Sequence, residues 1–336
     1  MKPTRDTIKS TPSEGYIYTT YGHPKYLKYA LASVETLRRY DPARPIALVC
    51  VDRHIRILKE LNLERFFDDI VPLEPDHASI VGFKHNVHRY MLYDRNLFLD
   101  SDIIWCKDPD PLWTSFSVYP FTVTGTQVSD SFFGGPKHLG VLTDILLQKR
   151  QRTLEHFGLT YLSRVQTGMM YAESSEATEN VCRLAARYLE RISETHFRSR
   201  LLEAGRDEES CEWSMAMAMS KLDIPVYPWL QGHSSPQLDF IESYTAYDLD
   251  FYSVICTYYS DNFVYNLRGL RSKWLRRFLI NLFSLLPGKG DSLSVTPYCL
   301  HFGWVHQKEP FYHFSERTWN RLLNENQLQK NLADVR

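Results

Sequence analysis

Residues 97–104 have the sequence LFLDSDII, and this stretch decides which fold the chain is expected to adopt. Its first three residues are apolar and predict a strand buried in a sheet. Two carboxylates, Asp100 and Asp102, follow directly after this strand. Ligands of open α/β sheets bind at the carboxyl ends of the strands, and hard divalent cations prefer oxygen ligands. The stretch therefore predicts a Mg²⁺ or Mn²⁺ site at the edge of a central sheet.

A metal site requires both carboxylates to point to one place. If the strand continues through residues 100–102, Asp100 and Asp102 lie on the same face, because side chains in a strand repeat with a period of two. Most short Asp-x-Asp sequences are solvated loop carboxylates, so it is the buried strand before this pair that favours a cation site.

Strands and helices alternate along the first hundred residues. The pattern predicts strands at 16–20, 46–51, 69–73 and 97–99, with helices at 26–40, 55–61 and 87–91. A further strand is expected at 120–125, a strand or loop at 165–172 and a short edge strand at 224–229. Helices are expected at 138–155, 177–192 and 212–221. Such alternation predicts an α/β fold whose mostly parallel sheet is covered by helices on both faces.

The composition excludes several classes of protein. Of the 336 residues, 43% are hydrophobic and 24% charged, which is typical of a globular protein of one large or two ordinary domains. A net charge of −1 provides no overall basic field, so we expect no nucleic-acid partner. The six cysteines lack CxxC spacing, which predicts reduced thiols in a cytoplasmic protein and disfavours a zinc cluster. The polar residues 1–14 lack the apolar segment of a secretory signal.

One region differs from the rest. Residues 233–297 are rich in Tyr and Asp and then become basic and amphipathic over 267–286. Such a helix either lies at an anionic membrane surface, giving peripheral attachment, or packs its apolar face on the core or on the partner subunit of a homo-oligomer. We therefore expect a tail at 1–14, a core at 15–232, an insertion at 233–297 and a C-terminal segment at 298–336.

The segment from Lys84 to Asp102 resembles the donor site of GT-A-fold glycosyltransferases of the glycogenin type. In that family a lysine near the start of a helix precedes an apolar strand that ends in Asp-x-Asp. The segments 17–22, 166–168 and 301–310 are similar, in the same order, to the family's first strand, its Asn-Ser-Gly element and its late His-Phe-x-Gly-x-x-Lys-Pro element. Two departures are that Gln166 replaces the family's Asn and that the spacing from His301 to Lys308 differs.

The resemblance implies a GT-A fold with a mostly parallel central sheet flanked by helices. It also implies transfer, with retention, of a sugar from a nucleoside-diphosphate sugar, preferably UDP-linked, to a glycan, glycolipid or protein acceptor. The C-terminal segment would complete the metal site, with Mn²⁺ or Mg²⁺ held by Asp100, Asp102 and His301. Gln166 and Glu212 are the candidate catalytic residues beside the sugar. The candidate donor-binding residues are Thr19, Thr20, Tyr21, Asp52, Lys84, Ser101 and Lys308.

The residues alone allow a structural interpretation of several of these positions. His301 stands next to Phe302 and would equally suit a packed core histidine, and Lys84 would suit a solvated helix lysine. Glu212 at a helix start would complement the helix dipole. Hydroxyls at strand ends, such as Thr19 and Thr20, often serve only as caps.

Three other functions fit parts of the pattern. A haloacid-dehalogenase-type phosphatase also has a strand followed by Asp-x-Asp, but that pair lies near the start of its fold. A nucleotidyltransferase of a related fold has a Gly-rich basic first loop, for which Gly22-His-Pro-Lys25 is a poor substitute. A non-catalytic relative that binds nucleotide sugars or carbohydrates remains a third interpretation. Mn²⁺-dependent hydrolysis of a nucleotide sugar separates the transferase from all three.

Overall fold

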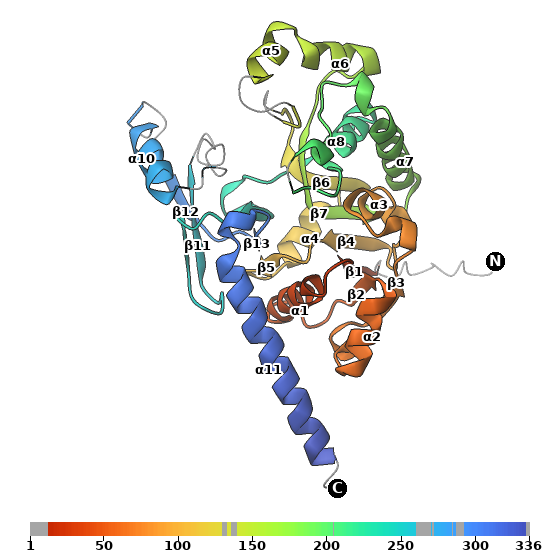
Figure 1. Cartoon of the computed structure of the whole chain (residues 1–336), viewed down its shortest axis with the longest axis vertical. Helices are drawn as coiled ribbons and strands as arrows, with labels where there is room; N and C mark the ends of the chain where they lie inside the picture. The colour runs from red at the N-terminus through yellow and green to blue at the C-terminus, as the bar shows by residue number, and fades with distance from the viewer. Residues whose placement is uncertain are drawn as a thin grey trace, which may run out of the picture.

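The centre of the molecule is a seven-stranded sheet in the order β3-β2-β1-β4-β7-β6-β8 (Figure 1). This computed structural model describes residues 13–129, 133–135, 140–203, 205–259, 270, 272–283, 285–286 and 292–333. The strands are β1 (Glu14–Thr20), β2 (Ile46–Cys50), β3 (Asp69–Pro72), β4 (Arg95–Leu99), β6 (Phe121–Thr126), β7 (Arg164–Glu173) and β8 (Tyr227–Pro228). Four neighbouring strands, β3 to β4 in this order, run parallel, whereas β7 is antiparallel to β4 and β6. The mostly parallel α/β sheet expected from the sequence is confirmed.

Helices cover both faces of this sheet because its strands are apolar on both sides. In β1, Ile17 belongs to one core cluster, and its neighbours Tyr16 and Tyr18 belong to the other. The Ile17 face is covered by α7 (Glu176–Glu190) and α8 (Glu212–Lys221). The Tyr16 face is covered by α1 (Lys25–Arg38), α2 (Asp52–Glu60) and α4 (Asp110–Phe116). Alternating side chains thus bury β1 between two layers of helices.

Two of the predicted helices differ in the structure. The helix expected at 138–155 is two helices, α5 (Gly140–Leu146) and α6 (Lys149–Phe157), and residues 138–139 lie outside the described residues. The break falls at Gln148, whose φ of 50° is left-handed and cannot continue a helix. The helix expected at 87–91 is the short 3₁₀ turn η3 (Val87–Arg89), which follows α3 (Ile80–Lys84).

A second, smaller sheet lies beside the first and consists of three short strands. These are β5 (Ile103–Trp105), β13 (Cys299–His301) and β9 (Gln237–Asp239), in the order β5-β13-β9. β13 runs antiparallel to β5 and parallel to β9. Since β9 lies within the region 233–297 that we expected to be an insertion, that region contributes directly to the sheet of the C-terminal segment.

The rest of the C-terminal half forms an outer unit beside this small sheet (Figure 1). An antiparallel sheet joins β10 (Thr245–Tyr247), β11 (Val254–Tyr259) and β12 (Ser292–Val295), and α10 (Lys273–Phe283) lies next to it. The long helix α11 (Glu309–Ala333) runs along α1, where Lys28 pairs with Glu316. Within the described residues, none of the helices combines the length and the apolar character needed to cross a bilayer.

Of the predicted tail at 1–14, residues 1–12 lie outside the described residues. Ser13 is bound to Asp94, and Glu14 is already the first residue of β1.

Candidate metal centre

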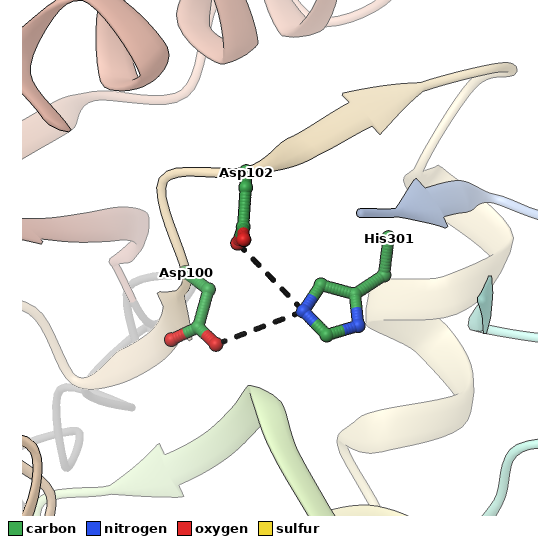
Figure 2. Close-up of side chains that lie close together, drawn as sticks. All are labelled: Asp100, Asp102 and His301. Carbon is green, nitrogen blue, oxygen red and sulfur yellow. Dashed lines mark ion pairs between the residues drawn. The ribbon is translucent and has the colours of Figure 1, made fainter. Parts of the chain in front are cut away.

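A turn at residues 100–102 brings the two aspartates to face His301 (Figure 2). β4 ends at Leu99, and the chain then turns into β5 of the small sheet, where Ile103 pairs with His301. Nε2 of His301 lies 3.8 Å from Oδ2 of Asp100 and 3.7 Å from Oδ1 of Asp102. One ligand atom from each of the three residues lies within 4.8 Å of the others.

The strand does not continue through residues 100–102, so the alignment that a continuing strand would give does not apply. The strand stops before Asp100, and the turn redirects the chain so that both side chains reach the same imidazole. Two backbone hydrogen bonds fix this turn. The amide of Asp100 donates to the carbonyl of Gly168 on β7 (2.9 Å), and the amide of Phe302 donates to the carbonyl of Asp102 (3.0 Å).

Each aspartate also pairs with a lysine. Nζ of Lys84 lies 2.6 Å from Oδ1 of Asp100 and donates to the carbonyl of Thr167 at 2.5 Å. Nζ of Lys308 forms an ion pair with Oδ2 of Asp102. We expected both lysines to contact the donor, and in the structure both contact the acidic pair directly. Lys84 is buried, so it is not a solvated helix lysine.

These charges determine the protonation of the cluster. Burial alone would raise the pKa of Asp102, but Lys308 and His301 outweigh it and lower that pKa to about 2. Burial would lower the pKa of His301, yet the hydrogen bond to Asp239 and the nearby carboxylates raise it to about 9. At neutral pH, without a metal, an ionised Asp102 therefore faces a protonated His301. A divalent cation that takes Nε2 of His301 as a ligand must displace its proton.

A third carboxylate, Asp239, orients His301. The parallel register of β9 and β13 places Asp239 opposite His301, with Oδ1 of Asp239 2.9 Å from Nδ1 of His301. The same Oδ1 accepts from Nε2 of Gln166 at 2.6 Å, and Oδ2 accepts from Nε1 of Trp304 at 3.2 Å. Because Nδ1 is directed to a carboxylate, Nε2 is left to face Asp100 and Asp102. This is the arrangement in which histidine binds metals.

The space between the ligands is kept open by a glycine. A Cβ added to Gly168 would lie 3.3 Å from Nε2 of His301 and 3.5 Å from Oδ2 of Asp100. It would also lie 3.2 Å from Oε1 of Gln237, and this oxygen is buried without a hydrogen-bond partner in the described part of the chain. Oxygen and imidazole ligands, an open space between them and an unsatisfied acceptor beside it fit a hard divalent cation.

The other predicted residues have partners or positions of their own. Gln166 on β7 donates to Asp239, and its own Oε1 is buried without a partner among the described residues. Thr19 donates to the carbonyl of Val49, and the hydroxyl of Thr20 lies 3.0 Å from Nδ1 of His54. Asp52 and Glu212 are the first residues of α2 and α8, and Ser101 is buried in the turn.

Tyr21 contacts Glu208, a residue that the sequence did not single out. Its hydroxyl donates to Oε2 of Glu208 at 3.1 Å, and the same oxygen accepts from the amide of Ile80 at 3.0 Å. Burial, Glu208 and Asp100 together raise the pKa of Tyr21. Glu208 thus joins the end of β1 to the start of α3. Asp239 was missed as well, and no spacing in the sequence marks either residue.

Two cavities lie elsewhere in the structure. One of about 580 Å³ is lined by residues that include Glu14, Arg44 and Asp110. The other, of about 610 Å³, lies at α6 and is lined by residues that include Gln148, Arg150 and His196. The acidic pair instead reaches solvent through Asp100, whose side chain is 33% exposed, compared with 15% for Asp102.

No protein-family profile matches this sequence, and no curated protein matches it. Among solved structures, the chain is similar to the galactosyltransferase LgtC in complex with donor and acceptor sugar analogs, with 9% identity over 93% of this chain and 95% of that chain and a TM-score of 0.49. It is similar to the glycosyltransferase GlyE of Streptococcus pneumoniae, with 12% identity over 95% of this chain but only 64% of that chain and a TM-score of 0.46. It is also similar to mouse xyloside xylosyltransferase 1, with 11% identity over 67% of this chain and 88% of that chain and a TM-score of 0.42. All three are glycosyltransferases by name.

Proposed function

We propose that this chain is a metal-dependent glycosyltransferase that uses a nucleoside-diphosphate sugar as donor. The observation that carries the proposal is the convergence of Asp100, Asp102 and His301, whose ligand atoms lie within 4.8 Å of one another. Three protein ligands of this kind leave coordination positions of Mn²⁺ or Mg²⁺ open for phosphate oxygens. A cation held there supplies positive charge to the diphosphate that leaves when the sugar is transferred.

The two lysines act on the same diphosphate. In the described structure Lys84 and Lys308 neutralise Asp100 and Asp102, each at hydrogen-bonding distance. With a cation held by the two carboxylates, both ammonium groups would be available to bind phosphate oxygens as compact point charges. The proposal thus gives the lysines two roles, as counterions before the donor binds and as phosphate ligands afterwards.

The donor sugar and the nucleotide are assigned to the two sides of this centre. We place the sugar beside Gln166 and Glu212, where the unpaired Oε1 of Gln166 is available to accept from a sugar hydroxyl. We place the nucleotide near the carboxyl ends of β1, β2 and β4, at Thr19, Thr20, Tyr21, Asp52 and Ser101, because nucleotides bind at this edge of open α/β sheets. The resemblance to the glycogenin type favours a UDP-hexose donor, retention of configuration, and a glycan, glycolipid or protein acceptor.

The test is donor hydrolysis without an acceptor. A panel of nucleotide sugars is incubated with the full chain and Mn²⁺, and release of the nucleoside diphosphate is measured. We expect turnover of one donor with the wild-type chain and a loss of at least about a hundredfold in Asp102→Asn, because the cation loses a ligand. The exposed Asp76, on the turn η2 (Pro75–His77), provides the control substitution Asp76→Asn, which should leave turnover unchanged.

The other outcomes each point to a different function. Binding of Mn²⁺ and UDP without hydrolysis of any donor would favour the non-catalytic relative. Release of inorganic phosphate from small phosphomonoesters would favour the phosphatase. Equal turnover in wild type and Asp102→Asn would contradict the metal centre.

A further inference from the structure

The helix α10 presents its apolar side to solvent. The side chain of Trp274 is 74% exposed, and those of Phe278 and Leu282 are each 49% exposed. In contrast, Arg276 and Ile280 of the same helix are buried. The sequence left open whether this apolar face packs on the core. In the structure Trp274, Phe278 and Leu282 do not pack on it.

The exposed side chains form one continuous face. Residues spaced by four along a helix lie above one another, and Trp274, Phe278 and Leu282 have this spacing. The rings of Trp274 and Phe278 stack at 5.6 Å, and Leu285 beyond the helix is 81% exposed. Figure 1 shows α10 at the outer edge of the molecule, on the far side of β11 and β12 from the seven-stranded sheet. A continuous exposed apolar face of this kind indicates a site of interaction.

The charge of this segment selects the partner. Between Leu267 and Gly290 the sequence contains six basic residues and no acidic one. Arg277 is exposed on α10 at the flank of the apolar face, whereas Lys273 pairs with Glu242. A helix with Trp, Phe and Leu on one side and basic residues at its edge is suited to the interface of an anionic bilayer.

We propose that α10 docks this protein on an anionic lipid bilayer, with Trp274, Phe278 and Leu282 inserted at the headgroup boundary and Arg277 against the lipid phosphates. A second copy of the chain is the less favourable occupant. A symmetric contact through this face would bring Arg277 toward Arg277 of the other copy, and like charges at an interface oppose association. The proposal concerns a surface apart from the metal centre and does not depend on the reaction.

Co-sedimentation of the full chain with vesicles tests the proposal. Vesicles of phosphatidylcholine alone are compared with vesicles of phosphatidylcholine and phosphatidylglycerol, at low and at high salt. The variants are Trp274→Ala/Phe278→Ala and Arg277→Glu, whose targets are exposed. Arg276 is left unchanged, because its guanidinium donates to the carbonyl of Leu270 at 2.7 Å and to Oγ of Ser243 at 3.2 Å. The control variants are Leu146→Ala on α5 and Arg152→Glu on α6, which change one exposed apolar and one exposed basic side chain elsewhere.

We expect salt-sensitive binding to the anionic vesicles only. Trp274→Ala/Phe278→Ala should abolish sedimentation, and Arg277→Glu should weaken binding by roughly fivefold or more, since each basic residue near such a surface strengthens attraction by about this factor. Both controls should bind like the wild type, and thermal unfolding should show that all variants are folded. Three results would overturn the proposal. They are no binding to anionic vesicles at low salt, binding that the aromatic substitutions leave intact, and a dimer in light scattering that these substitutions convert to a monomer.

Discussion

Under the proposed function, Lys308 is expected to compete with a metal ion for the carboxylate of Asp102. Its ammonium group pairs with Oδ2 of Asp102, and Oδ1 of that aspartate faces His301. In Lys308→Met this competitor and its repulsion of a cation are both removed. We therefore expect Mn²⁺, measured without nucleotide by electron paramagnetic resonance, to bind roughly tenfold more tightly, because the ion pair is mostly shielded from solvent. Donor turnover should nevertheless fall, since the proposed phosphate ligand is lost.

The control for this experiment is Lys59→Met, at an exposed position of α2. It removes one positive charge from the protein but none from the cluster, so Mn²⁺ affinity should stay at the wild-type value. If Lys308→Met only destabilises the fold and neither protein binds Mn²⁺, the cluster is a structural ion-pair network.

Asp239 is expected to act through His301. Oδ1 of Asp239 contacts both His301 and Gln166, and Oδ2 accepts from Trp304, so both oxygens are engaged by these three side chains. The amide in Asp239→Asn carries one acceptor oxygen, and its NH₂ must face one of these donors. The imidazole should then lose its fixed orientation, and we expect Mn²⁺ affinity to fall roughly 10–100-fold.

Calorimetric titration with Mn²⁺ measures this loss directly, without reference to turnover. Asp250→Asn, in the exposed segment between β10 and β11, is the matched control. Unchanged Mn²⁺ affinity in Asp239→Asn would show that Asp239 serves the packing of the small sheet only.

At the scale of single elements, α11 is anchored beside the metal centre by Phe311. This side chain is fully buried, and its ring centroid lies 5.0 Å from those of Tyr29 on α1 and Phe302 after β13. Phe311→Ala leaves a cavity between these elements. We expect the free energy of unfolding, measured with urea, to fall by about 3–5 kcal/mol.

The neighbouring residue supplies the comparison for Phe311. Tyr312 is 42% exposed although its ring also meets Tyr29, so Tyr312→Ala should reduce the stability by less than about 1 kcal/mol. Equal effects of the two substitutions would contradict the anchoring role of Phe311.

The elements also differ in how far the sequence determines them. β2 is apolar and buried at all five positions, and such a run predicts a central strand without further information. β5, β9 and β13 have three residues each, too few to show a period, and Ile103 pairs with His301 almost two hundred positions later. The sequence therefore predicted that Asp100 and Asp102 lie near a sheet edge. It did not predict the turn that directs them toward His301.

At the scale of the whole molecule, the predicted division of the chain does not separate the site from its surroundings. Asp239 lies in the region 233–297, expected to be an insertion, and it is hydrogen-bonded to both Gln166 and His301. The candidate metal centre thus combines distant parts of the chain. The family resemblance indicated Asp100, Asp102 and His301, but Asp239 and Glu208 depend on long-range contacts that leave no local pattern.

Two buried histidines contribute to the response of the whole molecule to acid. Burial lowers the pKa of His85 to about 4, and burial together with Arg150 lowers that of His196 to about 4. In the unfolded chain both groups should titrate near 6.5. Between pH 6.5 and 4 the unfolded state therefore binds more protons than the folded state, and stability falls as the pH decreases. At pH 5 each histidine should reduce the free energy of unfolding by about 2 kcal/mol relative to neutral pH.

Substitution of His85 isolates this effect from the titration of carboxylates. Nε2 of His85 lies 3.0 Å from Oγ of Ser214 on α8, so His85→Gln keeps a polar group able to reach this hydroxyl but removes the titrating ring. The variant is expected to be less stable than the wild type at pH 7.5, yet to lose about 2 kcal/mol less on acidification to pH 5. Urea unfolding of both proteins at the two pH values measures the difference. A loss in His85→Gln as large as in the wild type would mean that the ring of His85 accepts its proton in the folded state as readily as in the unfolded chain.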